Sequence, residues 1–425
     1  MGKIPICVVG CGGMGQRHIL AYKELEDSGI GNLELVAVCD LRKDNAERGA
    51  DEVERLFGRR PMVFTDLDKM LACDDIEAVD VVTDPSTHHS VAIPALLAGK
   101  HTQVEKPLGI TVAASKAIMD AAKKGGAVLA TSENLRRDPP NRLARAVIDS
   151  GLLGDIHLMV FNSLGGGNTM TITPWRHLKE RGAIGLDMGV HLTDIIQYYM
   201  GEFDQIYGTG LIVEKTRYKV QDLGDNSDLE SYVERQKEMP ESIEATGEDG
   251  AVAAYRMASG TMTLFSYVGA GKGGGQGTNT RSVHGRDGAM WAPGDRNGNQ
   301  VILRLAGGKT FTQKEIRGKD ILKLLPDFEM TEITQRLFGK DTVEYDLPFK
   351  AIDAKHMAIE FHDFADSIKT GKTPEVDGYV GMTAVAALLG AYESAIAGRS
   401  VTMDEIISGS VNTYQQEIDE ALGLS

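Results

Sequence analysis

Residues 4–15 read IPICVVGCGGMG, a short apolar run that leads directly into a glycine-rich turn. The apolar run predicts a buried strand, and the turn has the spacing GxGxxG through Gly10, Gly12 and Gly15. Gly10 permits a tight turn, Gly12 lets a pyrophosphate approach the backbone, and Gly15 lets the following helix pack closely on the strand. The free N–H groups at the start of that helix would face the phosphates. The stretch therefore predicts dinucleotide binding.

An acidic residue after the next apolar run supports this prediction. Asp40 follows residues 33–39, at a place where a carboxylate can hold the hydroxyls of the adenosine ribose. A carboxylate there repels a 2′-phosphate and favours NAD. Arg42 and Lys43 could offset that repulsion, so NADP stays open as an alternative. The expected contacts of this part of the cofactor are Gly10, Gly12, Gly13, Met14, Gly15, Asp40 and Arg42.

The first third of the chain alternates apolar runs with helical patterns. Strands are expected at residues 4–9, 33–39, 78–82, 101–104 and 128–131, and helices at 14–25, 90–98 and 113–124. Strands that are apolar throughout and separated by helices are typical of a parallel sheet covered on both faces. We assign residues 1–135 to an α/β Rossmann domain with a doubly wound parallel sheet.

The pattern changes after Asp138-Pro139-Pro140. Strands are expected at residues 157–163, 206–213, 251–257, 261–268 and 301–305, and helices at 141–150, 183–200, 355–367 and 381–396. Runs of strands without regular intervening helices indicate an open, mostly antiparallel sheet. We assign residues 136–425 to an α+β domain for substrate binding and oligomerisation, whose last helices are expected to pack back on the first domain.

Three segments stand outside this regular pattern. Residues 217–250 and 309–347 are polar or mixed, and we interpret both as excursions from the second sheet. The charged run 228–241 within the first excursion is expected to be a solvated face or helix. The glycine-rich residues 269–277 lack the spacing of a P-loop and are expected to form a loop that could cover the substrate.

Composition excludes several classes of protein. The formal net charge of −16 makes general nucleic-acid binding unfavourable. The four cysteines form no CxxC pair, so neither a disulfide framework nor a metal site is indicated. We find no signal-peptide layout and no apolar stretch near membrane-spanning length, and we therefore expect a cytoplasmic protein with no membrane partner.

Three later motifs carry a family resemblance. They are TDPSTH at residues 83–88, EKP at 105–107 and GLDMGVHLTD at 185–194, with a minor match, EVDG, at 375–378. In this order the motifs resemble the Gfo/Idh/MocA oxidoreductase family, over about residues 4–400. Residues 181–184 hold less glycine than is usual in the family, and the two excursions lengthen the chain. These departures leave the substrate open.

The resemblance implies Lys106, Asp187 and His191 as catalytic residues. Asp187 and His191 are four apart, so on a helix they share a face. His191 would take the substrate proton, and Asp187 would bind substrate hydroxyls or orient the imidazole. Lys106 follows a parallel strand, where its ammonium would stabilise the reacting oxygen. The resemblance also implies a cis peptide bond at Pro107.

Further contacts are assigned around these residues. The expected cofactor contacts also include Thr83, Pro85, His88, Glu105 and Lys106. The expected substrate contacts are Trp175, Arg176, His177, Asp187 and His191. His88 is expected to pack near the nicotinamide rather than to do chemistry.

The sequence thus predicts an NAD(P)-dependent dehydrogenase or reductase acting on a secondary hydroxyl of a sugar, polyol or glycoside. One alternative is a glycosidase that uses bound NAD for transient oxidation, elimination, hydration and re-reduction, with no net redox change. A minor alternative is a non-catalytic regulator that binds dinucleotide, although it would be expected to lack Lys106 or His191. An exposed apolar sheet face would need covering, so a homodimer or homotetramer is expected.

Overall fold

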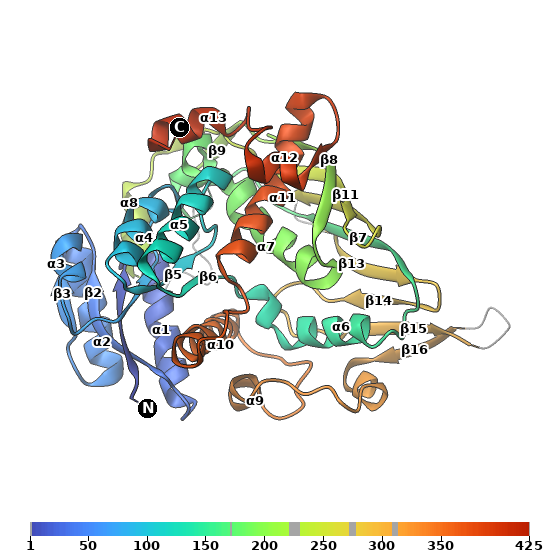
Figure 1. The fold of residues 1–425 in the computed structure, drawn as a ribbon, viewed down its shortest axis with the longest axis horizontal. Helices are drawn as coiled ribbons and strands as arrows, with labels where there is room; N and C mark the ends of the chain where they lie inside the picture. Colours follow the sequence, from blue (N-terminus) through green and yellow to red (C-terminus); the bar gives the residue numbers. More distant parts are fainter. Residues whose placement is uncertain (1, 171, 221–229, 272–277, 308–312, 425) are drawn as a thin grey trace.

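The N-terminal part of the chain is built on a parallel sheet. The computed structural model describes residues 2–170, 172–220, 230–271, 278–307 and 313–424. Six strands lie in the order β3-β2-β1-β4-β5-β6. Figure 1 draws this part of the chain in blue and cyan. Their bounds are β1 Ile4–Val9, β2 Leu33–Cys39, β3 Met62–Phe64, β4 Ala78–Val81, β5 His101–Glu105 and β6 Leu129–Ser132. The predicted doubly wound parallel sheet is confirmed.

The strand order fixes where a ligand can bind in this sheet. The order reverses between β1 and β4, which are neighbours although two strands separate them in sequence. Ligands of open α/β sheets bind beyond the carboxyl ends of the strands at such a switch point. The connecting helices are α1 Gly13–Asp27, α2 Lys43–Phe57, α3 Leu67–Leu71, α4 His88–Leu97 and α5 Val112–Gly125.

The rest of the chain forms a nine-stranded sheet in the order β16-β15-β14-β13-β7-β12-β11-β8-β17. All neighbouring strands in it are antiparallel except β7 and β12, which run parallel. The strands are β7 Ile156–Leu164, β8 Phe203–Leu211, β11 Gly250–Met257, β12 Met262–Val268, β13 Thr278–Gly285, β14 Gly288–Ala292, β15 Ile302–Ala306, β16 Gln313–Arg317 and β17 Val401–Thr402. The predicted large, mostly antiparallel sheet is confirmed.

Helices cover one face of this sheet. They are α6 Pro139–Asp149, which contacts β14, α7 Ala183–Met200, which contacts β11 and β12, and α11 Gly378–Ala397, which contacts β8. The length and composition of α11 would suffice for a membrane span, although we predicted no apolar stretch of that length. However, 78% of its apolar window is buried inside the protein. It is apolar because it lies in the core between the sheet, α7 and α5.

The closing part of the chain returns to the first domain. Helix α10 Phe349–Thr370 packs along α1, and the two helices lie side by side in Figure 1. The Phe361 ring stacks on Tyr22 with centroids 4.3 Å apart. Arg17 of α1 donates to Asp353 of α10 at 2.8 Å. Buried side chains of β1, β2, α1 and α10 therefore form one hydrophobic cluster.

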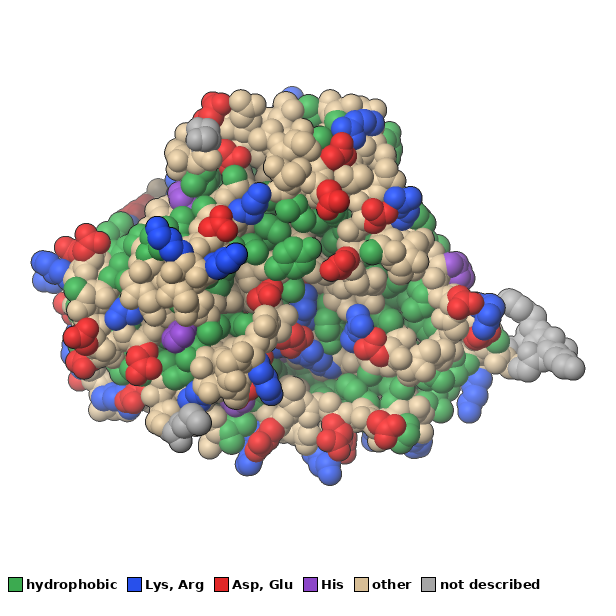
Figure 2. Space-filling model, in the orientation of Figure 1, with side chains coloured by type: hydrophobic (Ala, Val, Ile, Leu, Met, Phe, Trp, Pro, Cys, Tyr) green, Lys and Arg blue, Asp and Glu red, His purple; other side chains and the backbone are tan. Residues whose placement is uncertain are grey.

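The two excursions contain short elements. The first holds β9 Thr216–Tyr218 and β10 Ser242–Glu244, which pair antiparallel, and α8 Glu230–Glu238. The second holds α9 Glu332–Phe338, but its residues 313–317 form β16, which pairs with β15 at the edge of the large sheet. The prediction that the whole segment 309–347 leaves the sheet is therefore wrong for these residues. Helices α12 Met403–Ser408 and α13 Gln416–Leu422 end the chain. Figure 2 shows acidic and basic side chains interspersed with hydrophobic ones over the face that it draws.

Candidate active site

A cavity of about 830 Å³ runs from the end of β2 to the middle of α7. It lies at the carboxyl ends of the parallel strands, as the switch-point rule predicts. Most of the predicted site residues line it, namely Gly10, Gly12, Gly13, Met14, Asp40, Arg42, Thr83, Pro85, His88, Glu105, Lys106, Trp175, Arg176, Asp187 and His191. The fold thus gathers side chains that are up to about 180 positions apart in the sequence.

The β1–α1 turn is shaped for a dinucleotide. Gly10 has φ +102°, and a Cβ added at Gly15 would collide with the Gly10 carbonyl, so both positions require glycine. Helix α1 begins without a side-chain cap and without an acidic residue in its first turn. Its free N–H groups therefore remain available to an anionic ligand. Gly15 lies outside the cavity lining and serves helix packing.

Asp40 is oriented at the adenosine end of the cavity. Its carboxylate accepts hydrogen bonds from the backbone N–H groups of Cys11 and Arg42, both at 2.8 Å. The Asn45 side chain donates to it at 3.3 Å. These bonds fix the carboxylate beside the glycine turn, where it can accept ribose hydroxyls. The residues present therefore fit a bound dinucleotide.

Lys106 and Asp187 meet at the other end of the cavity. The Lys106 ammonium donates to the Asp187 carboxylate at 2.9 Å and to its backbone carbonyl at 3.1 Å. Arg176 donates to the second carboxylate oxygen at 2.8 Å. Burial would raise the pKa of Asp187, but Arg176 and Lys106 hold it well below its usual range. Asp187 is thus a carboxylate between two cations, and one N–H of Lys106 remains for a ligand.

The His191 imidazole is oriented by Glu133 rather than by Asp187. Its Nδ1 lies 2.7 Å from both carboxylate oxygens of Glu133. Burial would raise the pKa of Glu133, but the charge and hydrogen bond of His191 hold it below its ordinary value. Because the Glu133 carboxylate accepts a hydrogen bond from Nδ1–H, Nε2 is the nitrogen left to exchange a proton in the cavity. Our sequence reading missed Glu133, which follows β6 and belongs to none of the motifs.

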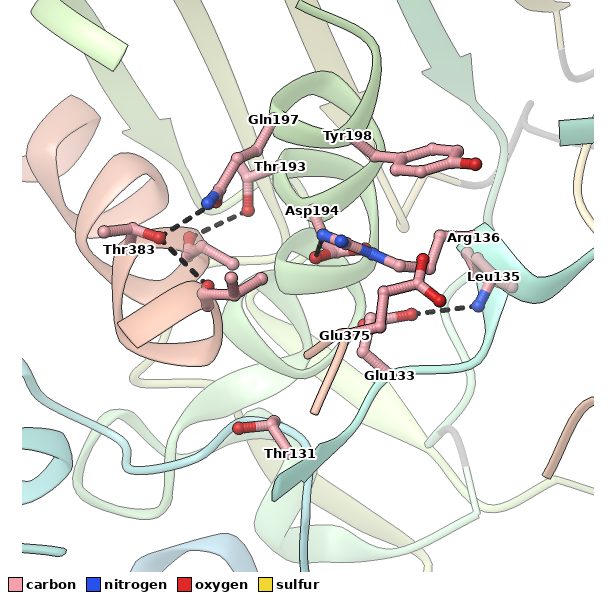
Figure 3. Close-up of polar contacts among 12 residues, drawn as sticks. Thr131, Glu133, Leu135, Arg136, Thr193, Asp194, Gln197, Tyr198, Glu375 and Thr383 are labelled. Carbon is pink, nitrogen blue, oxygen red and sulfur yellow. Dashed lines mark hydrogen bonds and ion pairs between the residues drawn. The ribbon is translucent and has the colours of Figure 1, made fainter. Parts of the chain in front are cut away.

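The last acid of the 185–194 motif anchors the segment that carries Glu133. Asp194 lies one turn after His191 on α7 and accepts a hydrogen bond from Arg136 Nε at 2.9 Å (Figure 3). The backbone N–H of Leu135 donates to Glu133 at 3.1 Å. Burial is the main cause that raises the pKa of Asp194 to about 6, opposed by Arg136. The motif therefore supplies both the histidine and the attachment of its partner.

Residues of the two shorter motifs, TDPSTH at 83–88 and EKP at 105–107, contact one another beside the cavity. The peptide bond Lys106–Pro107 is cis, as the family resemblance implied. His88 is fully buried and its ring nitrogens lie 2.8 Å from the Pro107 carbonyl and 3.2 Å from the Thr83 carbonyl. Burial lowers the pKa of His88. These contacts agree with a packing role for His88.

Three of the predicted substrate contacts lie in the turn before α7, and the structure places two of them in the cavity lining and one outside it. Trp175 and Arg176 line the cavity, and the guanidinium lies 4.5 Å from the indole centroid. His177 lies outside the cavity lining, and its carbonyl accepts from the N–H of Thr246 at 2.9 Å. Burial first, and then Arg217 and Arg176, lower the pKa of His177 to about 4. The placement of His177 therefore does not support substrate contact.

Two further predictions from the sequence concern the glycine-rich segment and metal binding. Of the glycine-rich segment 269–277, residues 272–277 lie outside the described residues. Within the described ranges, no group of three or more His, Cys, Asp or Glu side chains could hold a metal ion.

The cavity joins a dinucleotide turn to a Lys–Asp–His cluster, a combination that defines a class of two-domain oxidoreductases. Residues 4–133 match the family described as "Oxidoreductase family, NAD-binding Rossmann fold", and residues 141–291 match "GFO/IDH/MocA C-terminal domain". The chain belongs to the Gfo/Idh/MocA oxidoreductase family, as the motifs predicted. NAD is the cofactor of the matched fold.

Curated relatives match over part of their length. Levoglucosan dehydrogenase of Pseudarthrobacter phenanthrenivorans is 32% identical over 48% of this chain and 53% of its own. Glycosyl hydrolase family 109 protein 2 of Phocaeicola vulgatus is 33% identical over 36% of this chain and 37% of its own. The matched part thus spans about half or less of the length of these relatives.

The solved structures resemble the whole chain in fold. A levoglucosan dehydrogenase in complex with NADH and L-sorbose has a TM-score of 0.74 and covers 95% of this chain and 99% of its own. The sequence identity over this superposition is 21%. The likeness therefore establishes the two-domain fold.

Proposed function

We propose that this protein is an NAD(P)-dependent dehydrogenase or reductase that acts on a secondary hydroxyl of a sugar, polyol or glycoside. The observation that carries this proposal is one continuous cavity with Asp40 and the glycine turn at one end and Lys106, Asp187 and His191 at the other. A bound nicotinamide supplies the hydride acceptor. The names of the relatives, which include levoglucosan dehydrogenase, support a carbohydrate substrate.

Each residue of the cluster has a role in oxidation. Lys106 donates its free N–H to the reacting oxygen and stabilises the alkoxide charge. His191 accepts the hydroxyl proton at Nε2 while the C–H hydrogen leaves as hydride. Glu133 stabilises the imidazolium that results. Asp187 holds Lys106 and Arg176 in place and offers its remaining acceptor capacity to a substrate hydroxyl.

A redox-cycling glycosidase is the second candidate. It is supported by the 33% identity with a glycosyl hydrolase of family 109 over 160 residues. Such an enzyme would use the same cluster, oxidise a glycoside transiently, eliminate the aglycone, add water and reduce the product again. It would make no net change to the cofactor.

A paired assay separates the two candidates. The purified protein is given free sugars, polyols and chromogenic glycosides, with NAD and NADP separately, while nicotinamide reduction and aglycone release are followed together. We expect stoichiometric reduction of the nicotinamide, with NAD preferred because the Asp40 carboxylate beside the glycine turn would repel the 2′-phosphate of NADP. Aglycone release without net reduction would contradict a dehydrogenase and establish the glycosidase.

We also propose a cytoplasmic homo-oligomer that pairs through the uncovered face of the large sheet. Tyr207, Leu264 and Val252 are 63%, 47% and 44% exposed on β8, β12 and β11. Tyr207 and Leu264 both pair with Ala254, so they lie two strands apart on one face. An apolar face of this kind needs a covering partner.

Size-exclusion chromatography with light scattering is expected to give a dimer or tetramer. The variant Leu264→Lys would place a charge in the interface and is expected to shift the protein toward the monomer. Ile396→Lys replaces a slightly more exposed residue (53%) at the end of α11 and should leave the mass unchanged. A monomeric wild-type protein would contradict the proposed assembly.

A further inference from the structure

Helix α8 leaves the second domain and lies on the first. The label α8 in Figure 1 stands among the N-terminal elements, and the helix contacts α1. Its Glu234 forms an ion pair with Arg48 of α2 at 2.6 Å, and Glu238 lies 4.0 Å from Arg42. The charged run around this helix therefore docks on the dinucleotide-binding domain and is not wholly a solvated face.

Tyr232 of α8 occupies a notch at the glycine turn. Its ring lies where a Cβ at Gly13 would be, so a side chain at that position would collide with it. Tyr232 is 4% exposed and hydrogen-bonds Arg17 of α1. The absence of a side chain at Gly13 thus accommodates α8 directly beside the N-terminus of α1.

Arg235, one turn further on, brings a cation to the same place. Its guanidinium would lie 3.4 Å from a Cβ at Gly12, and the residue lines the cavity. It makes no hydrogen bond or ion pair with the described residues. Burial is the main cause that lowers the pKa of Arg235. Tyr232 and Asp84 oppose this shift, and the neighbouring cations Arg176 and Arg42 add to it.

A half-buried guanidinium that makes no ion pair with the described residues and lies beside a helix N-terminus is suited to bind phosphate. We propose that α8 is a strap across the dinucleotide site, in which Arg235 binds the pyrophosphate and Tyr232 fastens the helix to the glycine turn. The proposal rests on the dinucleotide binding of the proposed function and is independent of the substrate. The helix must lift before the dinucleotide can leave, so cofactor exchange is slow.

The test measures NADH binding without substrate. Equilibrium fluorescence titration gives Kd, and stopped-flow displacement by excess NAD gives the dissociation rate. Removing one charged phosphate ligand is expected to raise Kd about 10- to 100-fold in Arg235→Ala, mostly through faster dissociation. Arg235→Lys should fall between this variant and the wild type. Lys237→Ala removes an exposed charge from the same helix and serves as the matched control.

Tyr232→Ala keeps Arg235 but removes the fastening, and is expected to increase the NADH dissociation rate as well. Equal Kd and dissociation rate in Arg235→Ala and Lys237→Ala would overturn the strap and leave the proposed function intact. Tighter binding in either strap variant would also overturn it, because α8 would then be a plug that competes with the dinucleotide. Failure of the wild type to bind NADH would instead remove the proposed function itself.

Discussion

Replacing His191 by alanine is expected to lower kcat about 10²- to 10⁴-fold, the usual contribution of a general base. The reason is that His191 lines the cavity and its Nδ1 is held by Glu133 at 2.7 Å, which leaves Nε2 to exchange a proton with the substrate. Steady-state kinetics measure the loss, and added imidazole should restore part of the activity because the missing group is a base. The NADH Kd should change little.

His157→Ala provides the control, because this histidine is exposed on β7. Glu133→Gln keeps the shape of the partner but removes the charge that stabilises the imidazolium, so kcat should fall by about tenfold or more with little change in KM. Wild-type kcat in His191→Ala, or a loss in KM alone in Glu133→Gln, would contradict the assigned roles. Because the pKa of Glu133 is depressed, its carboxylate persists at pH values below the ordinary glutamate pKa and is lost only in stronger acid.

Replacing Lys106 by methionine is expected to lower kcat/KM about 10²- to 10³-fold, as found for single donors to a developing oxyanion. Methionine keeps the length of the side chain but removes the donor to the reacting oxygen. It also leaves Asp187 with Arg176 as its remaining cationic partner. The depressed pKa of Asp187 means that its ion pairs stabilise the fold above the unfolded-state pKa and are lost as the pH falls toward the folded-state pKa.

A thermal melt distinguishes loss of chemistry from loss of structure in this variant. Lys124→Met is the matched control, since Lys124 is exposed at the end of α5. A modest drop in Tm with the large loss in kcat/KM is the expected pattern for Lys106→Met. Activity within threefold of the wild type would remove Lys106 from the reaction.

Most of the first domain could be predicted because its strands are short, apolar runs with clear ends. The edge strand β3, Met62–Phe64, was not predicted because a run of three half-buried residues is too short to show a hydrophobic pattern. In the second domain β13 was not predicted, although it lies inside the sheet, because its sequence TNTRSVHG at residues 278–285 is mostly polar. Its buried Arg281 is compensated by an ion pair with Asp295, which the sequence pattern does not reveal.

The candidate site shows the same limit. Lys106, Asp187 and His191 lie within motifs, whereas Glu133 reaches His191 only through the tertiary fold. One signal was present: Glu133 directly follows the sixth parallel strand, at the edge where ligands bind. The docking of α8 was not predicted because the helix lies in a charged run. Tyr232 and Met239, which are both buried, have the spacing i, i+7 that places two residues on one face of a helix.

The packing of α10 on α1 has a consequence for protein engineering. Residues 349–370 complete the hydrophobic cluster of the first sheet although they come more than 200 positions after its last strand. An exchange of dinucleotide-binding domains between relatives that joined the chains only near residue 135 would match Tyr22 with a foreign counterpart of Phe361. Two crossover points, one after β6 and one around α10, would carry the native packing into the hybrid.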